Sequence, residues 1–264
     1  MPRAIWSGAI SFGLVNVPVK LFSAVSPKDV RFNQLEEGTN ARIKQKRVSA
    51  DTGMEVPYEK IIKGYEISPG QYVPITPEEL ESLDPESTRS IDIEDFVELE
   101  QIDPIFYERP YYLVPEKGGA KAYALLVQAM KDSGKVGIAR FVLRTKQYLA
   151  AIRPLGDVLV LETMLYSDEV NDVDELEGLP GAVDVSDREL KMARQLIESL
   201  STDFEPEKYA DEYREQVLAL IERKAEGQEI VAQPPIEEPA KVVDLMAALE
   251  ASLAAAKANK AASE

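Results

Sequence analysis

The sequence contains no histidine and no cysteine. The absence of cysteine excludes a disulfide framework, a thiolate zinc site and a cysteine nucleophile, and it fits a reducing cytoplasm. The absence of histidine removes the commonest general base and the commonest metal ligand. An enzyme built from this chain would therefore have to use carboxylates, lysine, serine or tyrosine.

Long hydrophobic runs are also missing. No apolar stretch is long enough to cross a bilayer, and the N-terminus lacks the hydrophobic region of a signal peptide. We therefore expect a cytoplasmic protein that has no membrane as a partner. At 264 residues, of which 45% are hydrophobic and 29% charged, the chain can bury one large core or two modest ones.

Charge is abundant but unevenly distributed, within a formal net charge of -17. Residues 1–70 carry 10 Lys and Arg against 7 Asp and Glu, and residues 116–160 carry 8 against 3. Residues 71–115 carry 2 against 12, and residues 161–264 carry 10 against 25. Because fields are screened beyond roughly 8 Å at physiological salt, two basic segments in an acidic chain can still attract a polyanion.

The most concentrated basic segment is 41–48. It predicts a short β-strand in which Arg42, Lys44 and Lys46 share one face and Arg47 lies on the other. Such a strand could bind phosphates, which require cations spaced along a surface. It could equally be a solvated edge strand that Lys and Arg protect from aggregation. A second basic group comprises Arg140, Arg144, Lys146 and Arg153.

The order of the predicted elements, strands before helices, indicates an α+β protein. Strands are expected over residues 3–25, 30–35, 41–48, 54–58, 90–99 (with a bulge near Asp95), 105–114, 136–144, 147–153 and 158–166. Helices are expected over residues 76–83, 118–134, 186–200, 206–226 and 240–258. In the second of these, Tyr123, Leu126, Val127 and Met130 have the spacing of one helix face, and the third opens with a capping box of Ser186 and Glu189.

Three other features have both a functional and a structural interpretation. The acidic run 92–100 could hold a divalent cation, but its acids alternate along a strand and favour a solvated face. The aromatic residues between Pro104 and Pro115 could stack on bases, but they favour a core or an interface. Ser186 is predicted to cap a helix rather than to act as a nucleophile, because the chain offers no base to activate it.

The last predicted helix follows a proline-rich linker at 233–239. Its apolar stripe has no predicted partner within the chain, which favours a helix that enters a groove on another protein. The alternatives are a helix docked on its own chain and a frayed tail. The stripe comprises Val243, Leu245, Met246, Leu249 and Leu253.

Five runs of the sequence resemble one protein family. They are residues 5–20 (Ile-Trp-Ser-Gly-Ala-Ile-Ser-Phe-Gly-Leu-Val-Asn-Val-Pro-Val-Lys), 63–66 (Lys-Gly-Tyr-Glu), 111–115 (Tyr-Tyr-Leu-Val-Pro), 188–193 (Arg-Glu-Leu-Lys-Met-Ala) and 213–215 (Tyr-Arg-Glu). Together and in this order they resemble bacterial Ku, over nearly the whole chain. The run Phe-Asn-Gln-Leu at 32–35 departs from that family, which commonly carries a histidine there.

The resemblance implies a β-barrel core with an extended arm, which forms a ring in a homodimer, followed by C-terminal helices. The core would span 1–181 with the arm at about 41–115, a helical extension 182–232, and the linker and partner-binding helix 233–264. The implied function is sequence-independent binding of double-stranded DNA ends and recruitment of the ATP-dependent DNA ligase of non-homologous end joining. No catalytic residue, metal or cofactor is implied, and the protein would associate with the nucleoid at breaks.

The resemblance also implies which residues contact the partners. Arg42, Lys44, Lys46 and Arg47 would belong to the segment that leads into the arm. Arg144 and Lys146 would form a basic turn that faces the DNA. The further DNA-binding candidates are Lys20, Arg31, Lys63 and Arg140, and the apolar stripe of the last helix is the candidate ligase contact.

Two other classes of function remain open on the residues alone. One is an acidic protein-interaction adaptor without a DNA role, which a mobility shift with a short blunt duplex would distinguish. The other is a carboxylate-based metallonuclease, for which Mg²⁺-dependent cleavage would be the signature.

Overall fold

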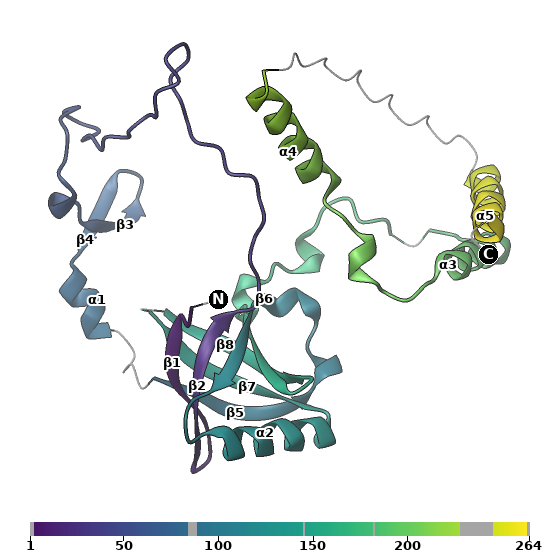
Figure 1. The fold of residues 1–264 in the computed structure, drawn as a ribbon, viewed down its shortest axis with the longest axis horizontal. Helices are drawn as coiled ribbons and strands as arrows, with labels where there is room; N and C mark the ends of the chain where they lie inside the picture. Colours follow the sequence, from purple (N-terminus) through teal and green to yellow (C-terminus); the bar gives the residue numbers. More distant parts are fainter. Residues whose placement is uncertain (1–2, 84–88, 145, 182, 228–244, 263–264) are drawn as a thin grey trace. The chain divides into compact units, whose positions relative to one another are not determined.

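The computed structural model describes residues 3–83, 89–144, 146–181, 183–227 and 245–262 (Figure 1). Contacts between backbone segments divide the chain into two units. The first contains Met1–Lys28 and Asn33–Glu175, and the second contains Asp29–Phe32 and Leu176–Glu264. The strands belong to the first unit, and the helices beyond residue 176 belong to the second.

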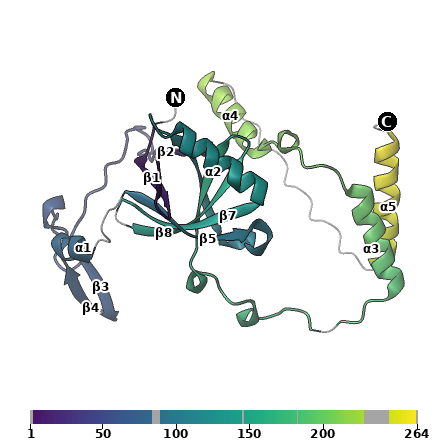
Figure 2. The same cartoon turned by 90° about the horizontal axis from the view of Figure 1, so that it is seen from below.

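Seven strands of the first unit form a closed barrel in the order β1-β2-β6-β9-β8-β7-β5 (Figures 1 and 2). Neighbouring strands are antiparallel except β1 and β5, which close the barrel by a short parallel pairing. Closure leaves no free sheet edge. The strands are β1 (Trp6–Phe12), β2 (Val15–Ser23), β5 (Ser90–Glu98), β6 (Tyr107–Pro115), β7 (Lys135–Leu143), β8 (Lys146–Leu155) and β9 (Val158–Met164).

The barrel interior is the hydrophobic core of the first unit. Alternate residues point inward, as the period of two of a strand requires, so that Val17, Val19 and Leu21 of β2 are all buried. The Phe141 ring packs 6.2 Å from the Trp6 ring and 5.8 Å from the Tyr148 ring, measured between centroids. The only tryptophan of the chain therefore reports directly on this core.

Helix α2 (Ala120–Ser133) packs against the barrel core and ends at Gly134, whose φ of 67° is left-handed. The Tyr123 hydroxyl donates to the Leu113 carbonyl and accepts from the Leu159 amide, both at 2.7 Å, so the helix is tied to β6 and β9. Burial raises the pKa of Tyr123. The buried residues of α2 have the spacing that the sequence predicted, and they are Tyr123, Leu126, Val127 and Met130.

Residues 33–83 form an arm segment without a core of its own. No side chain that is described between residues 33 and 80 is buried. The Glu36 amide donates to the Ala41 carbonyl (2.9 Å), and the Ser49 amide donates to the Met54 carbonyl (2.8 Å), closing two turns. The arm segment also contains a 3-10 turn (Tyr58–Lys60), a two-stranded sheet of β3 (Lys63–Ser68) and β4 (Gln71–Ile75), and helix α1 (Pro77–Leu83).

Three expected strands, over residues 30–35, 41–48 and 54–58, are not strands in the structure. They contribute only single bridges, which join Leu35 to Arg42 and Val48 to Glu55. Each turn pairs only the residues beside it, so no continuous hydrogen-bonded ladder forms between the two turns. The basic segment is consequently a loop, and we call residues 41–48 the basic loop.

The expected range of the arm, about 41–115, also includes residues that the structure places elsewhere. Both β5 and β6 are barrel strands. In β5 the register shifts between Ile93 and Asp95, which confirms the predicted bulge near Asp95. Other connections in the described chain are 3-10 turns, at Leu99–Gln101, Pro104–Phe106, Ser167–Glu169, Val173–Glu175 and Pro206–Lys208.

The second unit contains the C-terminal helices, so an α+β fold with a β-barrel followed by helices is confirmed. Ser186 Oγ accepts from the Glu189 amide (3.3 Å) and Glu189 Oε2 accepts from the Ser186 amide (2.9 Å), which is the predicted capping box. The second helix begins at Glu212 rather than at Pro206, because Asp211 provides its cap. The helices are α3 (Asp187–Leu200), α4 (Glu212–Ala225) and α5 (Leu245–Ala262).

Two contacts organise the second unit. Helices α3 and α5 lie side by side in Figures 1 and 2. The early segment Asp29–Phe32 borders one cavity together with Tyr213, Arg214 and Val217 of α4. None of the described helices is both long and apolar enough to span a membrane.

Candidate nucleic-acid interface

The basic loop presents four exposed cations, and two of them are positioned by uncharged neighbours. Arg42 Nη2 donates to Asn33 Oδ1 at 2.9 Å. The Arg47 guanidinium lies 5.2 Å from the centroid of the Tyr58 ring. Both contacts orient a guanidinium without neutralising it, so both side chains can still attract an anion.

Lys44 and Lys46 differ in their surroundings. Lys46 Nζ lies 2.6 Å from Glu55 Oε2, whereas Lys44 has no ion pair with any described residue. The expected division of the segment into two faces does not hold, because it depends on a strand geometry that the loop lacks. Local partners, rather than alternation, distinguish the four cations.

On the barrel, three predicted cations have carboxylate partners. Arg140 also faces Asp92 across the β5–β7 pair. The Arg153–Glu162 pair is partly buried, whereas the other two pairs are more exposed and contribute little to stability. In each pair, a cation beside a carboxylate attracts phosphate less than a free cation does. The pairs are Lys20–Glu116 (3.5 Å), Arg140–Glu94 (3.4 Å) and Arg153–Glu162 (2.7 Å).

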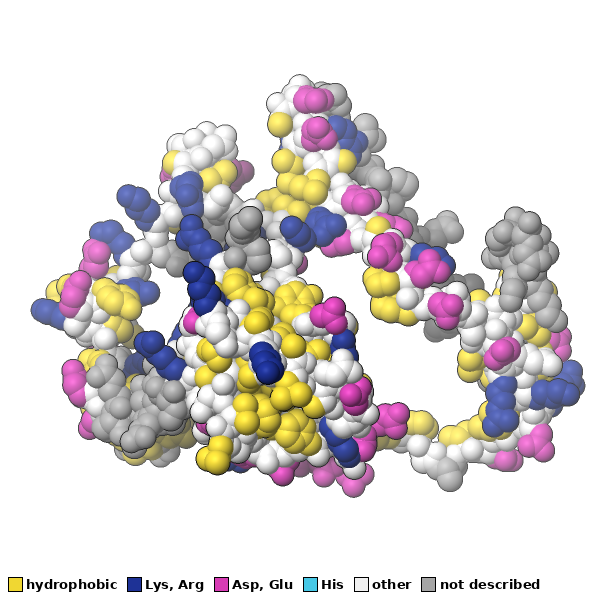
Figure 3. All heavy atoms as spheres, turned by 60° about the horizontal axis from the view of Figure 1, so that its bottom comes forward, with side chains coloured by type: hydrophobic (Ala, Val, Ile, Leu, Met, Phe, Trp, Pro, Cys, Tyr) yellow, Lys and Arg dark blue, Asp and Glu magenta, His cyan; other side chains and the backbone are white. Residues whose placement is uncertain are grey.

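The turn between β7 and β8 carries Arg144 and Lys146 without carboxylate partners among the described residues. Lys146 Nζ lies 5.1 Å from the centroid of the Tyr148 ring. Arg144 has a left-handed φ of 63°. Figure 3 shows Lys and Arg side chains exposed on the barrel and on the arm segment. This turn is the predicted basic site with the least local neutralisation.

Lys63 and Arg31 are exposed and form no ion pair within the described part of the chain. Lys63 begins β3 in the arm segment. Arg31 belongs to the second unit, whereas the other predicted DNA-binding residues belong to the first.

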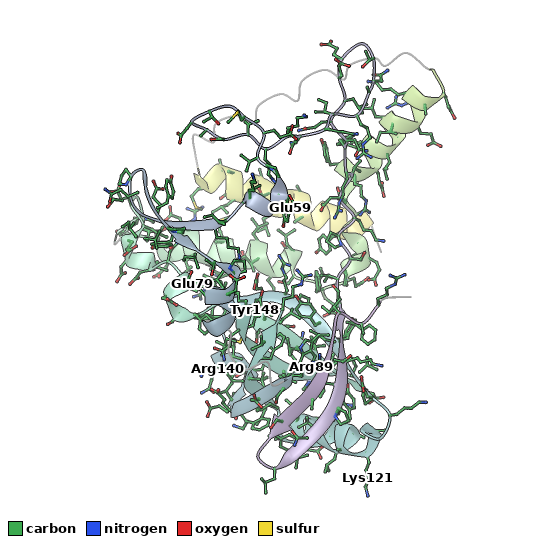
Figure 4. All side chains as sticks on the ribbon, turned by 90° about the vertical axis from the view of Figure 1, so that its left-hand side faces the viewer. Glu59, Glu79, Arg89, Lys121, Arg140 and Tyr148 are labelled. Atoms are coloured by element: carbon green, nitrogen blue, oxygen red, sulfur yellow. The ribbon has the colours of Figure 1, made fainter. Side chains whose placement is uncertain are left out.

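Sequence reasoning missed Arg89, which directly precedes β5. Arg89 and Arg144 line one cavity of about 300 Å³ with Trp6, Ser7 and Val142. Figure 4 shows Arg89, Arg140 and Tyr148 on the barrel. No pattern in the sequence marks Arg89, because its neighbours are brought together only by barrel closure.

The acidic run of β5 behaves as a solvated face. Glu94 and Glu98 form ion pairs with Arg140 and Lys135. Among the residues that the structure describes, no group of three or more acids is placed to hold a metal ion. Of the aromatic residues in β6, Tyr111 is buried and packs in the core.

Comparison with known proteins identifies the family. Residues 11–192 match the family described as the Ku70/Ku80 beta-barrel domain. The chain belongs to the Ku family. Relatives named "Non-homologous end joining protein Ku" come from Anaeromyxobacter sp. (strain K), Heliobacterium modesticaldum and Desulfitobacterium hafniense. They are 56%, 46% and 49% identical to this chain, over 97%, 98% and 96% of its length and 87%, 94% and 87% of their own.

The Ku match confirms the resemblance inferred from the five sequence runs. It includes the basic loop, Arg89 and the β7–β8 turn, and it ends within α3. The arrangement of cations described above is therefore carried mainly by the Ku barrel domain.

The apolar stripe of the last helix has a partner within the chain, contrary to the sequence-based expectation. Helix α5 packs on α3, and Arg188 Nη2 of α3 lies 3.4 Å from Glu250 Oε1 of α5. Met246, Leu249 and Leu253 are half-buried, at the spacing of one helix face. Val243 lies outside the described residues, and α5 begins at Leu245.

Proposed function

We propose that this protein binds the ends of double-stranded DNA during non-homologous end joining. It does so independently of sequence, as a homodimer whose arms complete a ring, and it is not an enzyme. Membership of the Ku family carries the proposal, since the relatives are named for this pathway. The proposed domain boundaries are 181/182 and 232/233, and the proposed location is the cytoplasm, at broken nucleoid DNA.

The distribution of cations supports binding through the DNA backbone. The basic loop and the β7–β8 turn offer guanidinium and ammonium groups, which bind phosphates and read no bases. The elements that carry them are a loop and a turn rather than a helix suited to the major groove. Such contacts fit ends of any sequence.

The arm segment supports a homodimer. Its apolar side chains are exposed on a stretch without a core, and exposed patches of this kind mark interaction surfaces. A second copy of the chain that packs against these side chains would bury the apolar surface that one chain leaves exposed. The exposed residues include Ile61, Ile62, Tyr65, Ile67, Tyr72 and Val73.

The ring is tested by DNA topology. Linear blunt duplex should bind, and a covalently closed circle of the same length should bind much more weakly because it offers no end to thread. Retention is measured by mobility shift at low and moderate salt. Equal affinity for both would contradict the ring, and binding to neither would favour the acidic adaptor.

The basic loop is tested by comparing two neighbouring lysines. Lys44→Gln should flatten the plot of log affinity against log salt by roughly 0.9 for a lost phosphate contact. Lys46→Gln should flatten it less, because Glu55 already neutralises Lys46. Identical slopes for both variants and the wild type would remove the basic loop from the interface.

We also propose that α5 contributes to recruitment of the ATP-dependent DNA ligase. Because α5 packs on α3, its stripe would have to leave that site, or the α3–α5 pair would have to act as one surface. Deleting residues 240–264 should preserve DNA affinity and abolish stimulation of the ligase on linear duplex. Loss of DNA binding on this deletion would contradict the assignment.

A further inference from the structure

We propose that the cavity between Arg89 and Arg144 is a binding site for a single phosphate group. Its walls are formed by Trp6, Ser7, Arg89, Val142 and Arg144. Where the phosphate belongs to DNA, the proposal rests on the function proposed above. Where the phosphate is free in solution, the site stands independently of that function.

Barrel closure creates the cavity. Strand β5 begins at Ser90, which pairs with Ala9 of β1, and Arg89 lies just beyond this pair. The Ala9 amide donates to the Arg89 carbonyl at 2.9 Å, which fixes the backbone of Arg89 against β1. A Cβ at Gly8 would lie 2.1 Å from that carbonyl oxygen, so only glycine permits this approach.

The two guanidinium groups have no carboxylate partner among the residues that the structure describes. Neither Arg89 nor Arg144 forms an ion pair with any residue in the described ranges, whereas Arg140, two residues before Val142 on β7, pairs with Glu94. Two cations that line one cavity repel each other, and an anion placed between them removes that repulsion. The planar guanidinium fork matches the geometry of a phosphate, and Ser7, which also lines the cavity, has a hydroxyl that can donate a hydrogen bond.

The backbone provides an independent observation. The described non-glycine residues with positive φ are Asn40, Arg89 and Arg144, so two of them line this cavity. Leu143 pairs with Lys146, and a two-residue connection of this kind favours glycine, asparagine or aspartate rather than arginine. Residues held in such conformations concentrate at functional sites.

The size of the cavity limits its ligand. A volume of about 300 Å³ lies at the lower limit of small-molecule sites. It accommodates one phosphate with the sugar that carries it, rather than a longer stretch of polymer. Arg89 and Arg144 should therefore share one phosphate instead of contacting two in succession.

Sharing gives the proposal a distinctive signature in the salt dependence of DNA binding. Arg89→Gln and Arg144→Gln should each flatten the slope by about 0.9, and the double variant should flatten it by the same amount, since one phosphate is lost in each case. The control is Lys121→Gln, which removes an exposed cation from α2, apart from Arg89 (Figure 4), and should keep the wild-type slope. Thermal unfolding of each variant verifies that it is folded.

Trp6 provides a second readout that needs no DNA. It is the only tryptophan and lines the cavity, so titration with inorganic phosphate should change its emission in the wild type and in Lys121→Gln. The change should be absent from the double glutamine variant. An emission response without coupled slopes assigns the site to free phosphate, and coupled slopes without a response assign it to the DNA backbone.

The proposal is overturned if the slope losses of the two single variants add in the double variant and Trp6 does not respond to phosphate. It is also overturned if neither measurement depends on the two arginines. Failure of the proposed function gives a different result, because the wild-type protein itself would then not bind duplex DNA. The variant that combines Arg89→Lys and Arg144→Lys keeps both charges but loses the planar guanidinium groups. Its salt slope should lie between that of the double glutamine variant and that of the wild type.

Discussion

The barrel and the arm segment belong to one unit of the chain but differ in what holds them together. The barrel encloses a core that includes Ile10, Leu21, Phe141 and Ile152, each no more than 2% exposed. The arm segment has no buried side chain between residues 33 and 80 as far as the structure describes them. The barrel therefore specifies its own fold, whereas the arm segment depends on local turns and on whatever covers it.

The local structure of the arm segment is too small to be stable by itself. A two-stranded sheet such as β3–β4 is marginal in water without a third strand or a packed face. Its exposed Tyr65, Ile67 and Tyr72 would gain stability only through burial against another surface. We therefore expect assembly, rather than chain folding alone, to complete the arm.

The largest expected effect is in the barrel core. Phe141→Ala removes a ring that packs against Trp6 and Tyr148 and should lower the free energy of unfolding by about 3–5 kcal/mol. Urea unfolding followed by Trp6 fluorescence measures the loss. Met54→Ala in the arm segment, at 67% exposure, should cost less than about 0.5 kcal/mol. Similar costs for both would contradict the division between core and arm.

The next effect is on assembly. Ile67→Glu places a charge among the exposed apolar residues of β3 and should weaken dimerisation by roughly thirtyfold or more, the effect of an interface hot spot. Sedimentation equilibrium measures it. Leu14→Glu, at a fully exposed position between β1 and β2, is the matched control and should leave the dimer intact. An unchanged dimer in Ile67→Glu would show that β3 lies outside the interface.

A smaller effect is expected from a substitution in the β7–β8 turn, which should raise stability and lower DNA affinity. Arg144→Gly relieves a left-handed conformation and should raise the free energy of unfolding by about 1 kcal/mol. The same change removes a guanidinium and should weaken DNA binding. Denaturation and a mobility shift on the same variant test both signs. A variant that gains stability without losing affinity would remove Arg144 from the interface.

The smallest effect concerns pH. Because the chain has no histidine or cysteine, DNA affinity should change by no more than about twofold between pH 6 and pH 8. At acid pH the hydrogen bond from Ser186 holds the pKa of Glu189 below its ordinary value of 4.5. That contribution to stability is present above pH 4.5 and is lost as the pH falls through the lowered pKa. DNA affinity measured between pH 6 and pH 8 checks the first statement, and a marked change near neutrality would contradict it. Thermal unfolding measured as the pH falls below 4.5 checks the second.

Local signals predicted the parts of the fold that depend on neighbouring residues. The capping box at Ser186, the spacing of the buried residues in α2 and the bulge near Asp95 all follow from short-range periodicity and hydrogen bonding. The similarity to Ku, carried by five runs, predicted the barrel that these elements build.

Features that depend on distant partners were not predictable. The basic loop has strand-like composition, but a strand requires a neighbour that supplies hydrogen bonds, and the sequence does not show whether one exists. The packing of α5 on α3 and the parallel pairing of β1 with β5 are likewise long-range. Sequence reasoning missed Arg89 for the same reason, because the cavity that Arg89 lines forms only when the barrel closes.

The segment Asp29–Phe32 has a consequence for how the protein is synthesised. It leaves the ribosome early, yet its neighbours in the second unit, including Tyr213 and Val217, are among the later residues to emerge. During translation the barrel can close while this short peptide stays exposed to chaperones and proteases. Once α4 has emerged, Val30 is half-buried at the cavity that α4 lines, whereas Asp29, Arg31 and Phe32 stay exposed. A nascent polypeptide stalled before α4 therefore leaves Val30 without these later neighbours.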